Sequence, residues 1–278
     1  MADRLVVAAP AKLNLVLRVG APGPDGYHPL ASLMVALAGL EDEVRIAADD
    51  ERTLVCSGGP SGAANLAWRA VDVLEDACGR ALPARIEIVK RVPMQAGLGG
   101  GSSNAAAVLA GLDALYRLGL SMAELERLAA QLGSDVPFFV RGGTQWATGR
   151  GERLTPAPLP ADLWAVICGP VAPLSTAAVY RAFDELGGAR PLDPTPPTGS
   201  WADGGWVAND LWPAARRLAP QLGAAADDLA RLGAHTVLLC GSGGALAGLW
   251  TSRAAADSAM ARLPSAIALA WPRAGRTD

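Results

Sequence analysis

Short hydrophobic runs alternate with polar turn residues along the first half of the chain. Runs rich in Val, Ile and Leu predict strands at positions 5–8, 13–19, 43–48, 52–56 and 85–92. Pro10 stands between the first two runs and predicts an interruption there, and the turn residues at 21–26 end the second run.

Helical periodicity lies between these strands. Apolar residues three and four positions apart predict a helix over 65–78 that ends at Gly79, followed by an Ala-rich helix over 103–118. Ser121 and Glu124 have the spacing of a capping box, which predicts a helix that runs to Leu132.

The second half contains the same mixture of elements. We predict strands at 163–168, 236–240 and 245–250, and helices at 176–186, 210–222, 224–232 and 253–263. Four prolines make 187–204 a long loop. Pro and Gly accumulate near 155–160, so we predict an α/β (α+β) protein with two domains, 1–155 and 156–278.

Composition narrows the function classes. Of 278 residues, 51% are hydrophobic and 18% charged, which excludes a mainly disordered chain. A net charge of −3 argues against nucleic-acid binding as the main role. The uncharged stretches 92–112 and 232–252 contain too many glycines and polar residues to be convincing membrane helices. The N-terminus lacks signal-peptide features and the four cysteines form no CxxC pair, so we expect a cytoplasmic protein.

The glycine-rich segment 93–104 is the strongest chemical signal. It lies between a predicted strand and a predicted helix and has four glycines within 97–101. Glycines let a backbone wrap closely around a ligand, and the N–H groups and dipole of the following helix favour phosphate. Ser102 and Ser103 add hydroxyl groups that could donate hydrogen bonds or reach a magnesium ion.

Two familiar phosphate-binding patterns do not fit this segment. A Walker A loop requires a lysine that is missing here, and a GxGxxG pattern fails because Ser102 or Asn104 takes the place of the third glycine. The alternative without a function is a flexible linker, but a linker need not separate a strand from a helix.

The segment resembles the phosphate-binding motif of the GHMP kinases, the superfamily of galactokinase, homoserine kinase and mevalonate kinase. The chain is similar, more narrowly, to the branch that phosphorylates 4-diphosphocytidyl-2-C-methyl-D-erythritol in the non-mevalonate route to isoprenoid precursors. The matching segments, in order, are 10–15 (PAKLNL), 24–28 (PDGYH), 97–103 (GLGGGSS), 133–139 (GSDVPFF), 142–144 (GGT), 147–152 (ATGRGE), 209–211 (NDL) and 240–244 (CGSGG). The resemblance extends from Lys12 to about Leu249.

This resemblance implies the two-domain GHMP architecture, with the active site between the domains. It implies transfer of the γ-phosphoryl group of ATP to the 2-hydroxyl of the acceptor, with Mg²⁺ bridging phosphates and no protein ligand assigned to the metal. The expected partner is a small cytidine diphosphate-linked molecule, neither nucleic acid nor a membrane. We expect a monomer or a weak homodimer.

The resemblance also assigns catalytic roles. Asp135 matches the aspartate that accepts the hydroxyl proton, and Lys12 matches a lysine that lies near Asp135 and the transferred phosphoryl group. Taken alone, Asp135 before Val136 and Pro137 predicts a turn or cap outside the αR region, and Lys12 a surface residue. Asn14 falls on the same side of a strand as Lys12, and a buried asparagine without partners is costly, so we expect it to contact substrate.

Binding residues follow from the same resemblance. Tyr27 and His28 are assigned to the cytidine pocket with Tyr180 as the opposing ring; an exposed turn pair is the alternative for the first two. The ATP site is assigned to Asn65, Leu66, Pro93, Met94, Gln95, Ala96, Gly97, Leu98, Gly99, Gly100, Gly101, Ser102 and Ser103. A plain N-cap is the alternative for Asn65.

Two later segments are open to structural interpretations. Gly241–Gly244 resembles a third family motif near the active site, but it fits a hairpin turn nearly as well. Asn209 and Asp210 are expected to cap the following helix.

Two rival functions remain at this point. Another GHMP kinase, of the mevalonate or homoserine type, would keep the glycine segment without needing Tyr27 and His28. A non-catalytic nucleotide-binding protein would need neither Lys12 nor Asp135, so their joint presence argues against it.

Overall fold

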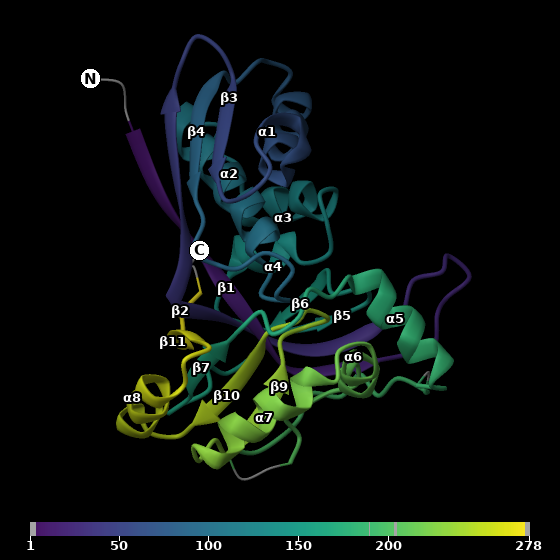
Figure 1. Ribbon diagram of the computed structural model, residues 1–278. Helices are drawn as coiled ribbons and strands as arrows, with labels where there is room; N and C mark the ends of the chain where they lie inside the picture. The colour runs from purple at the N-terminus through teal and green to yellow at the C-terminus, as the bar shows by residue number, and fades with distance from the viewer. Residues whose placement is uncertain (1–3, 189, 203–204, 276–278) are drawn as a thin grey trace.

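Two long antiparallel strands, β1 (Arg4–Val19) and β2 (Leu30–Ala48), extend through both parts of the molecule (Figure 1). The computed structural model describes residues 4–188, 190–202 and 205–275. Positions 189, 203 and 204 of the predicted loop lie outside these ranges, as do the first three residues of the predicted N-terminal segment. The two strands bring residues from the start of the chain into contact with elements from its end.

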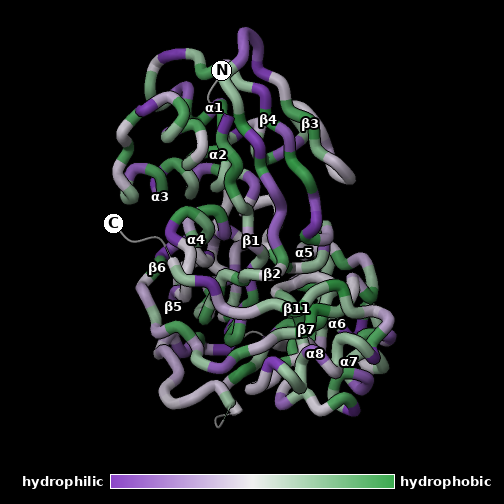
Figure 2. The backbone as a smooth tube through the Cα atoms, turned by 90° about the vertical axis from the view of Figure 1, so that its left-hand side faces the viewer, coloured by the Kyte–Doolittle hydropathy of each residue, from purple (hydrophilic) through white to green (hydrophobic). Residues whose placement is uncertain are grey.

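The N-terminal part consists of one sheet region with helices packed on one face (Figure 1). Its further elements are β3 (Thr53–Ser57), a short 3₁₀ helix (Gly62–Ala64), α1 (Leu66–Cys78), β4 (Ala84–Val89), α2 (Gly100–Tyr116), α3 (Met122–Ala130) and α4 (Val136–Arg141). Hydropathy alternates along β4 and the second half of β2 (Figure 2), because one face of these segments packs on the helices and the other is more exposed.

The C-terminal part continues the same sheet. Its elements are β5 (Thr144–Thr148), β6 (Arg153–Pro156), β7 (Trp164–Cys168), α5 (Thr176–Glu185), β8 (Ala208–Asn209), α6 (Trp212–Leu218), α7 (Gln221–Arg231), β9 (Thr236–Leu239), β10 (Leu246–Trp250), α8 (Arg253–Arg262) and β11 (Ala266–Pro272). Within the described ranges the sheet order is β3-β4-β2-β11-β7-β10-β9, and β11 pairs with both β2 and β7. The predicted α/β class is confirmed, and the boundary at 155/156 remains a proposal.

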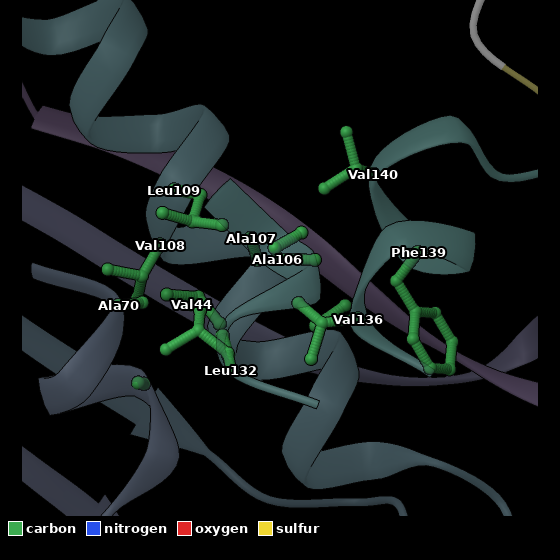
Figure 3. Packing of buried hydrophobic residues seen from close by; sticks show 14 of the residues in the cluster. Val44, Ala70, Ala106, Ala107, Val108, Leu109, Leu132, Val136, Phe139 and Val140 are labelled. Atoms are coloured by element: carbon green, nitrogen blue, oxygen red, sulfur yellow. The ribbon is translucent and has the colours of Figure 1, made fainter. Parts of the chain in front are cut away.

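The buried core of the N-terminal part holds α2 and α4 in place. Figure 3 shows side chains of α2 and α4 packed in one cluster with Val44 of β2 and Leu132. Phe139 of α4 also lies against the glycine segment, because a methyl group built on Gly99 would be only 2.6 Å from the Phe139 ring. The core therefore supports the segment that precedes α2.

Several predicted boundaries are confirmed. Helix α1 follows Asn65 and ends at Gly79, which adopts a left-handed conformation with φ 68°. The capping box of Ser121 and Glu124 is present at the start of α3. These signals are local, since each depends on residues only a few positions apart.

Other predictions are wrong for identifiable reasons. β1 is continuous through Pro10, because a register shift between Pro10 and Lys12 accommodates the missing N–H group. The two helices predicted over 210–222 and 224–232 are present, but the break between them lies at Ala219 and Pro220, since proline cannot donate the hydrogen bond of a helix interior. Leu211, without a side-chain cap, precedes α6, so Asn209 and Asp210 do not cap it.

Neither uncharged stretch forms a membrane span. Segment 92–112 is the glycine segment followed by part of α2, and 232–252 contains the β9–β10 hairpin. Within the described ranges, no helix is long and apolar enough to cross a membrane.

Candidate active site

The glycine segment forms one wall of a cavity of about 380 Å³. Gly97 and Gly99 have φ angles of 77° and 74°, a region that favours glycine. Gly99 precedes α2, whose first turn contains no acidic residue. The first N–H groups of a helix have no intrahelical acceptor, so this end of α2 offers donors and a positive dipole to an anion.

Nearly all of the predicted ATP residues line this cavity. Asn65, Leu66 and every position from Pro93 to Ser102 contribute to its wall. Ser103 does not line it, and its buried hydroxyl has no hydrogen-bond partner among the described residues. Lys90 and Asn104, the last residue of the glycine segment, also line this wall, although neither was assigned to the ATP site.

Asn65 is the N-cap of α1 and also lines the first cavity, while contact with ATP stays a prediction. Its side-chain oxygen accepts a hydrogen bond from the Ala67 N–H at 3.0 Å, which makes it the N-cap of α1. Its amide nitrogen donates to the Pro60 carbonyl at 2.8 Å. These two hydrogen bonds fix the side chain of a residue that is itself part of the cavity wall.

The second glycine turn, Gly241–Gly244, packs directly against the glycine segment. A methyl group built on Gly97 would lie 1.6 Å from the Cys240 carbonyl oxygen, and one on Gly243 would lie 2.1 Å from the Gly97 nitrogen. Asn209 donates to the Gly241 carbonyl at 2.7 Å. The turn is thus a structural support of the cavity wall.

Gly97→Ala should lower the free energy of unfolding by at least about 2 kcal/mol, because it combines a left-handed backbone with overpacking. Urea denaturation measures this. Gly101→Ala is the matched control, since a methyl group there meets no atom within 4 Å and the position is helical. Equal stability of the two variants would show that the turns do not interlock.

Lys12 and Asp135 form an ion pair beside the glycine segment. The distance from Lys12 Nζ to Asp135 Oδ2 is 3.7 Å, and Nζ donates to Asn14 Oδ1 at 2.5 Å. Lys12 is only 5% exposed, which excludes a surface role, and its backbone N–H donates to the Leu98 carbonyl at 3.0 Å. The lysine is therefore anchored to the segment that lines the cavity.

Asp135 departs from its predicted backbone conformation. It lies in the αR region, with φ −84° and ψ −14°, and precedes α4. The restriction before proline falls on Val136, the residue that directly precedes Pro137. The Asp135 side chain makes no capping hydrogen bond, so its carboxylate is left for Lys12 and for a ligand.

Asn14 has partners inside the protein. Besides accepting from Lys12, it donates to Ser32 Oγ at 2.8 Å, and Ser32 in turn donates to the Val16 carbonyl. The argument that unmet hydrogen bonds require substrate contact is therefore wrong. Asn14 holds the Lys12 ammonium in place, and contact with substrate stays a proposal.

A second cavity, of about 560 Å³, is next to Asp135 in the chain, because Ser134 is part of its wall. Tyr27, His28 and Tyr180 all line it, together with Ser134, the neighbour of Asp135. The His28 and Tyr180 rings contact each other, with centroids 5.1 Å apart and planes at 48°. The structure thus brings together the three residues assigned to the cytidine pocket, whereas Asn14 does not line this cavity.

Two neighbours fix the geometry of this cavity. His28 Nε2 lies 2.8 Å from Asp184 Oδ1, a contact between residues 156 positions apart that the sequence did not reveal. The Arg150 guanidinium lies 4.2 Å from the centroid of the exposed Tyr27 ring. One face of Tyr27 is therefore covered by a cation.

Burial keeps two groups near the ion pair neutral. It raises the pKa of Tyr180 to about 12, and the Asp135 carboxylate adds to this shift. Burial also raises the pKa of the Cys240 thiol to about 12, in spite of the nearby Lys12. Neither group competes with Asp135 as a base near neutral pH.

Magnesium has no ready-made protein cage in this region. The described part of the chain contains no cluster of three His, Cys, Asp or Glu residues suited to a metal. Mg²⁺ is commonly held by one or two protein oxygens, water and substrate phosphates. Ser102, which lines the first cavity, fits this minimal requirement.

The ion pair stands between the two cavities. Lys12 contacts the glycine segment that lines one of them, and Asp135 adjoins Ser134, which lines the other. A bond joins the two sides, because Thr176 of the second cavity lies 2.9 Å from Ser242 of the glycine turn. An anionic group bound in the first cavity and a polar group bound in the second could therefore meet beside Lys12 and Asp135.

Comparison with known proteins agrees with this geometry. Residues 65–143 match the model of the GHMP kinases N terminal domain. The chain is 38% identical over 255 residues to the 4-diphosphocytidyl-2-C-methyl-D-erythritol kinase of Desulfitobacterium hafniense, covering 89% of this chain and 87% of that protein. It is 39% identical to the protein of that name from Moorella thermoacetica, covering 94% and 93%. A crystal structure of 4-(cytidine 5'-diphospho)-2C-methyl-D-erythritol kinase superposes with a TM-score of 0.79 at 36% identity, covering 97% of this chain and all of that one.

Proposed function

The chain belongs to the 4-diphosphocytidyl-2-C-methyl-D-erythritol kinase family of the GHMP kinases, and we propose on this basis that it phosphorylates the 2-hydroxyl of that compound with ATP. The product would serve isoprenoid precursor biosynthesis. We also propose that the protein is cytoplasmic and that it is a monomer or a weak homodimer.

The observation that supports this function most strongly is the position of the Lys12–Asp135 pair between two cavities. The glycine segment and the start of α2 would hold the triphosphate in the first cavity. The acceptor would occupy the second, with its hydroxyl directed at Asp135.

The transfer then follows from the two charges. The acceptor oxygen forms a bond to the γ-phosphorus as the bond from that phosphorus to the β–γ bridging oxygen breaks, and ADP leaves. Asp135 accepts the hydroxyl proton. Lys12, held by Asn14, stabilises the negative charge of the transferred group in a buried site where such charges interact strongly.

Magnesium, when bound with ATP, would neutralise part of the phosphate charge. We propose that Ser102, which lines the first cavity, would contribute a protein oxygen to such an ion.

The aromatic cavity favours the cytidine-linked acceptor over the substrates of other GHMP kinases. A base can stack on the Tyr27 and Tyr180 rings, while a small polyol or amino acid has no use for them. Because Asp184 contacts Nε2 of His28, we propose that Nδ1 is the ring nitrogen that accepts a hydrogen bond from the acceptor molecule. Such an acceptor suits the exocyclic amine of cytosine.

Asp184→Ala should raise the KM for the acceptor about tenfold, through loss of one hydrogen bond to a charged partner. The KM for ATP should not change, because Asp184 lines the second cavity and not the first. Steady-state kinetics with each substrate varied in turn provides the test. Glu185→Ala is the control, since its carboxylate pairs with Arg217 instead. An unchanged acceptor KM in Asp184→Ala would refute the role of Asp184.

The proposed function is tested by ADP release with Mg-ATP and a panel of acceptors: the cytidine-linked compound, mevalonate, homoserine and galactose. We expect turnover with the first alone. Turnover with another acceptor would retain the superfamily and refute the substrate. ATP binding without turnover on any of them would favour a non-catalytic nucleotide-binding protein.

A further inference from the structure

Asp42 lies outside both cavities, and its side chain has no exposed surface. Its Oδ1 accepts hydrogen bonds from the backbone N–H groups of Arg91 at 2.7 Å and Val92 at 2.8 Å. Its Oδ2 accepts from Asn104 Nδ2 at 2.9 Å and from Lys90 Nζ. Four donors surround one buried carboxylate, so its charge is fully compensated.

These donors come from the two ends of the glycine segment. Arg91 and Val92 directly precede Pro93, whereas Asn104 belongs to the first turns of α2. Lys90 Nζ also donates to Asn104 Oδ1 at 3.1 Å, which closes a triangle of three side chains. Asp42, on β2, thereby connects the entrance of the segment to its exit.

Lys90 brings this network to the cavity wall. It lines the first cavity, and a methyl group built on Gly100 would lie 3.0 Å from its Nζ. The ammonium is already paired with Asp42, so the pair adds no net charge to the cavity. Attraction for an anion therefore depends on the backbone N–H groups of the segment and on their exact spacing.

We propose that Asp42 is a positioning residue for the nucleotide. Through Asn104 and Lys90 it sets the separation between the two ends of the glycine segment, and hence the placement of the N–H groups that would bind the triphosphate. The inference rests on the proposed ATP site.

Two variants remove different contacts of the Asp42 network. Asp42→Asn can still accept from Arg91 and Val92, but it turns an NH₂ group toward the donors of Asn104 and Lys90. Asn104→Ala removes the connection to α2 and leaves the ion pair intact. Glu43→Gln is the matched control, since this neighbouring carboxylate pairs with arginines on the surface.

Calorimetric titration with ATP in the absence of acceptor gives the readout, together with KM values and thermal unfolding. We expect both network variants to bind ATP at least about tenfold more weakly, as when one partner of a buried charged hydrogen bond is lost. Their acceptor KM should stay within about twofold of the wild type, as should every value for Glu43→Gln.

Three results would overturn the proposal. In the first, Asn104→Ala folds and binds ATP as tightly as the wild type does. In the second, Asp42→Asn binds ATP more tightly, which would mean that Lys90 attracts phosphate and that its pairing with Asp42 weakens this attraction. A parallel loss of ATP affinity, acceptor affinity and thermal stability would reduce Asp42 to general support of the fold. A wild-type chain that binds no ATP would instead refute the proposed function on which the inference rests.

Discussion

Replacing Asp135 with asparagine should lower kcat by at least about 100-fold while ATP binding changes only a few-fold. Asparagine keeps the size of the side chain but cannot accept the hydroxyl proton. The carboxylate makes no capping bond in α4, so its loss should not unfold that helix. Single-turnover kinetics at saturating substrates would isolate the chemical step.

Asp257→Asn is the control for a lost carboxylate, since Asp257 lies on α8 in an exposed pair with Arg253. It should retain full turnover. If Asp135→Asn were as active as this control, the acceptor proton would have to leave by another route and Asp135 would lose its assigned role.

Lys12→Met should also reduce kcat by about 100-fold or more, the effect of removing one donor aimed at developing charge. Methionine has a similar length and no charge. Lys12→Arg should not restore turnover, because methyl groups built on Gly99 and Gly241 would each lie 3.1 Å from atoms of the lysine side chain. This close packing suits a slender ammonium chain and leaves little room for a guanidinium.

The two lysine variants distinguish charge from shape when their kcat and thermal stability are measured together. Lys12→Met leaves the Asn14 oxygen buried without a donor, which costs about 1–3 kcal/mol of stability. Wild-type turnover in Lys12→Arg would mean that any cation suffices at this position. Wild-type turnover in Lys12→Met would remove the lysine from the mechanism.

Local signals in the sequence predicted the elements that they directly encode. Asn65 and Gly79 mark the two ends of α1, and Ser121 with Glu124 marks the start of α3, because caps depend on side chains next to the helix end. The glycine segment was equally recognisable, since Gly97 and Gly99 both adopt left-handed conformations that favour glycine.

Elements buried on both faces escaped prediction. The first half of β2, from Leu30 to Leu40, is apolar almost throughout because both of its faces are covered: Met34 packs in one hydrophobic cluster and Val35 in another. It therefore lacks the alternation by which a half-exposed strand is recognised. β11 was missed because its place in the sheet depends on pairing with β2, more than 200 residues earlier.

The site shows the same division between local and distant signals. The resemblance supplied Lys12 and Asp135, and the structure places them 3.7 Å apart. Asp42 and Asp184 carry no motif, because each acquires its partners only when distant segments meet in the fold. Positioning residues of this kind are invisible to pattern reasoning from one sequence.

The phosphorus NMR spectrum of the reaction product is the most direct test of the central claim. The wild-type chain would be incubated with Mg-ATP and 4-diphosphocytidyl-2-C-methyl-D-erythritol. We predict one new phosphomonoester resonance per ADP formed, with the diphosphate of the acceptor intact, and none with Asp135→Asn over the same time. Formation of ADP with inorganic phosphate alone, and no new phosphomonoester, would contradict the account.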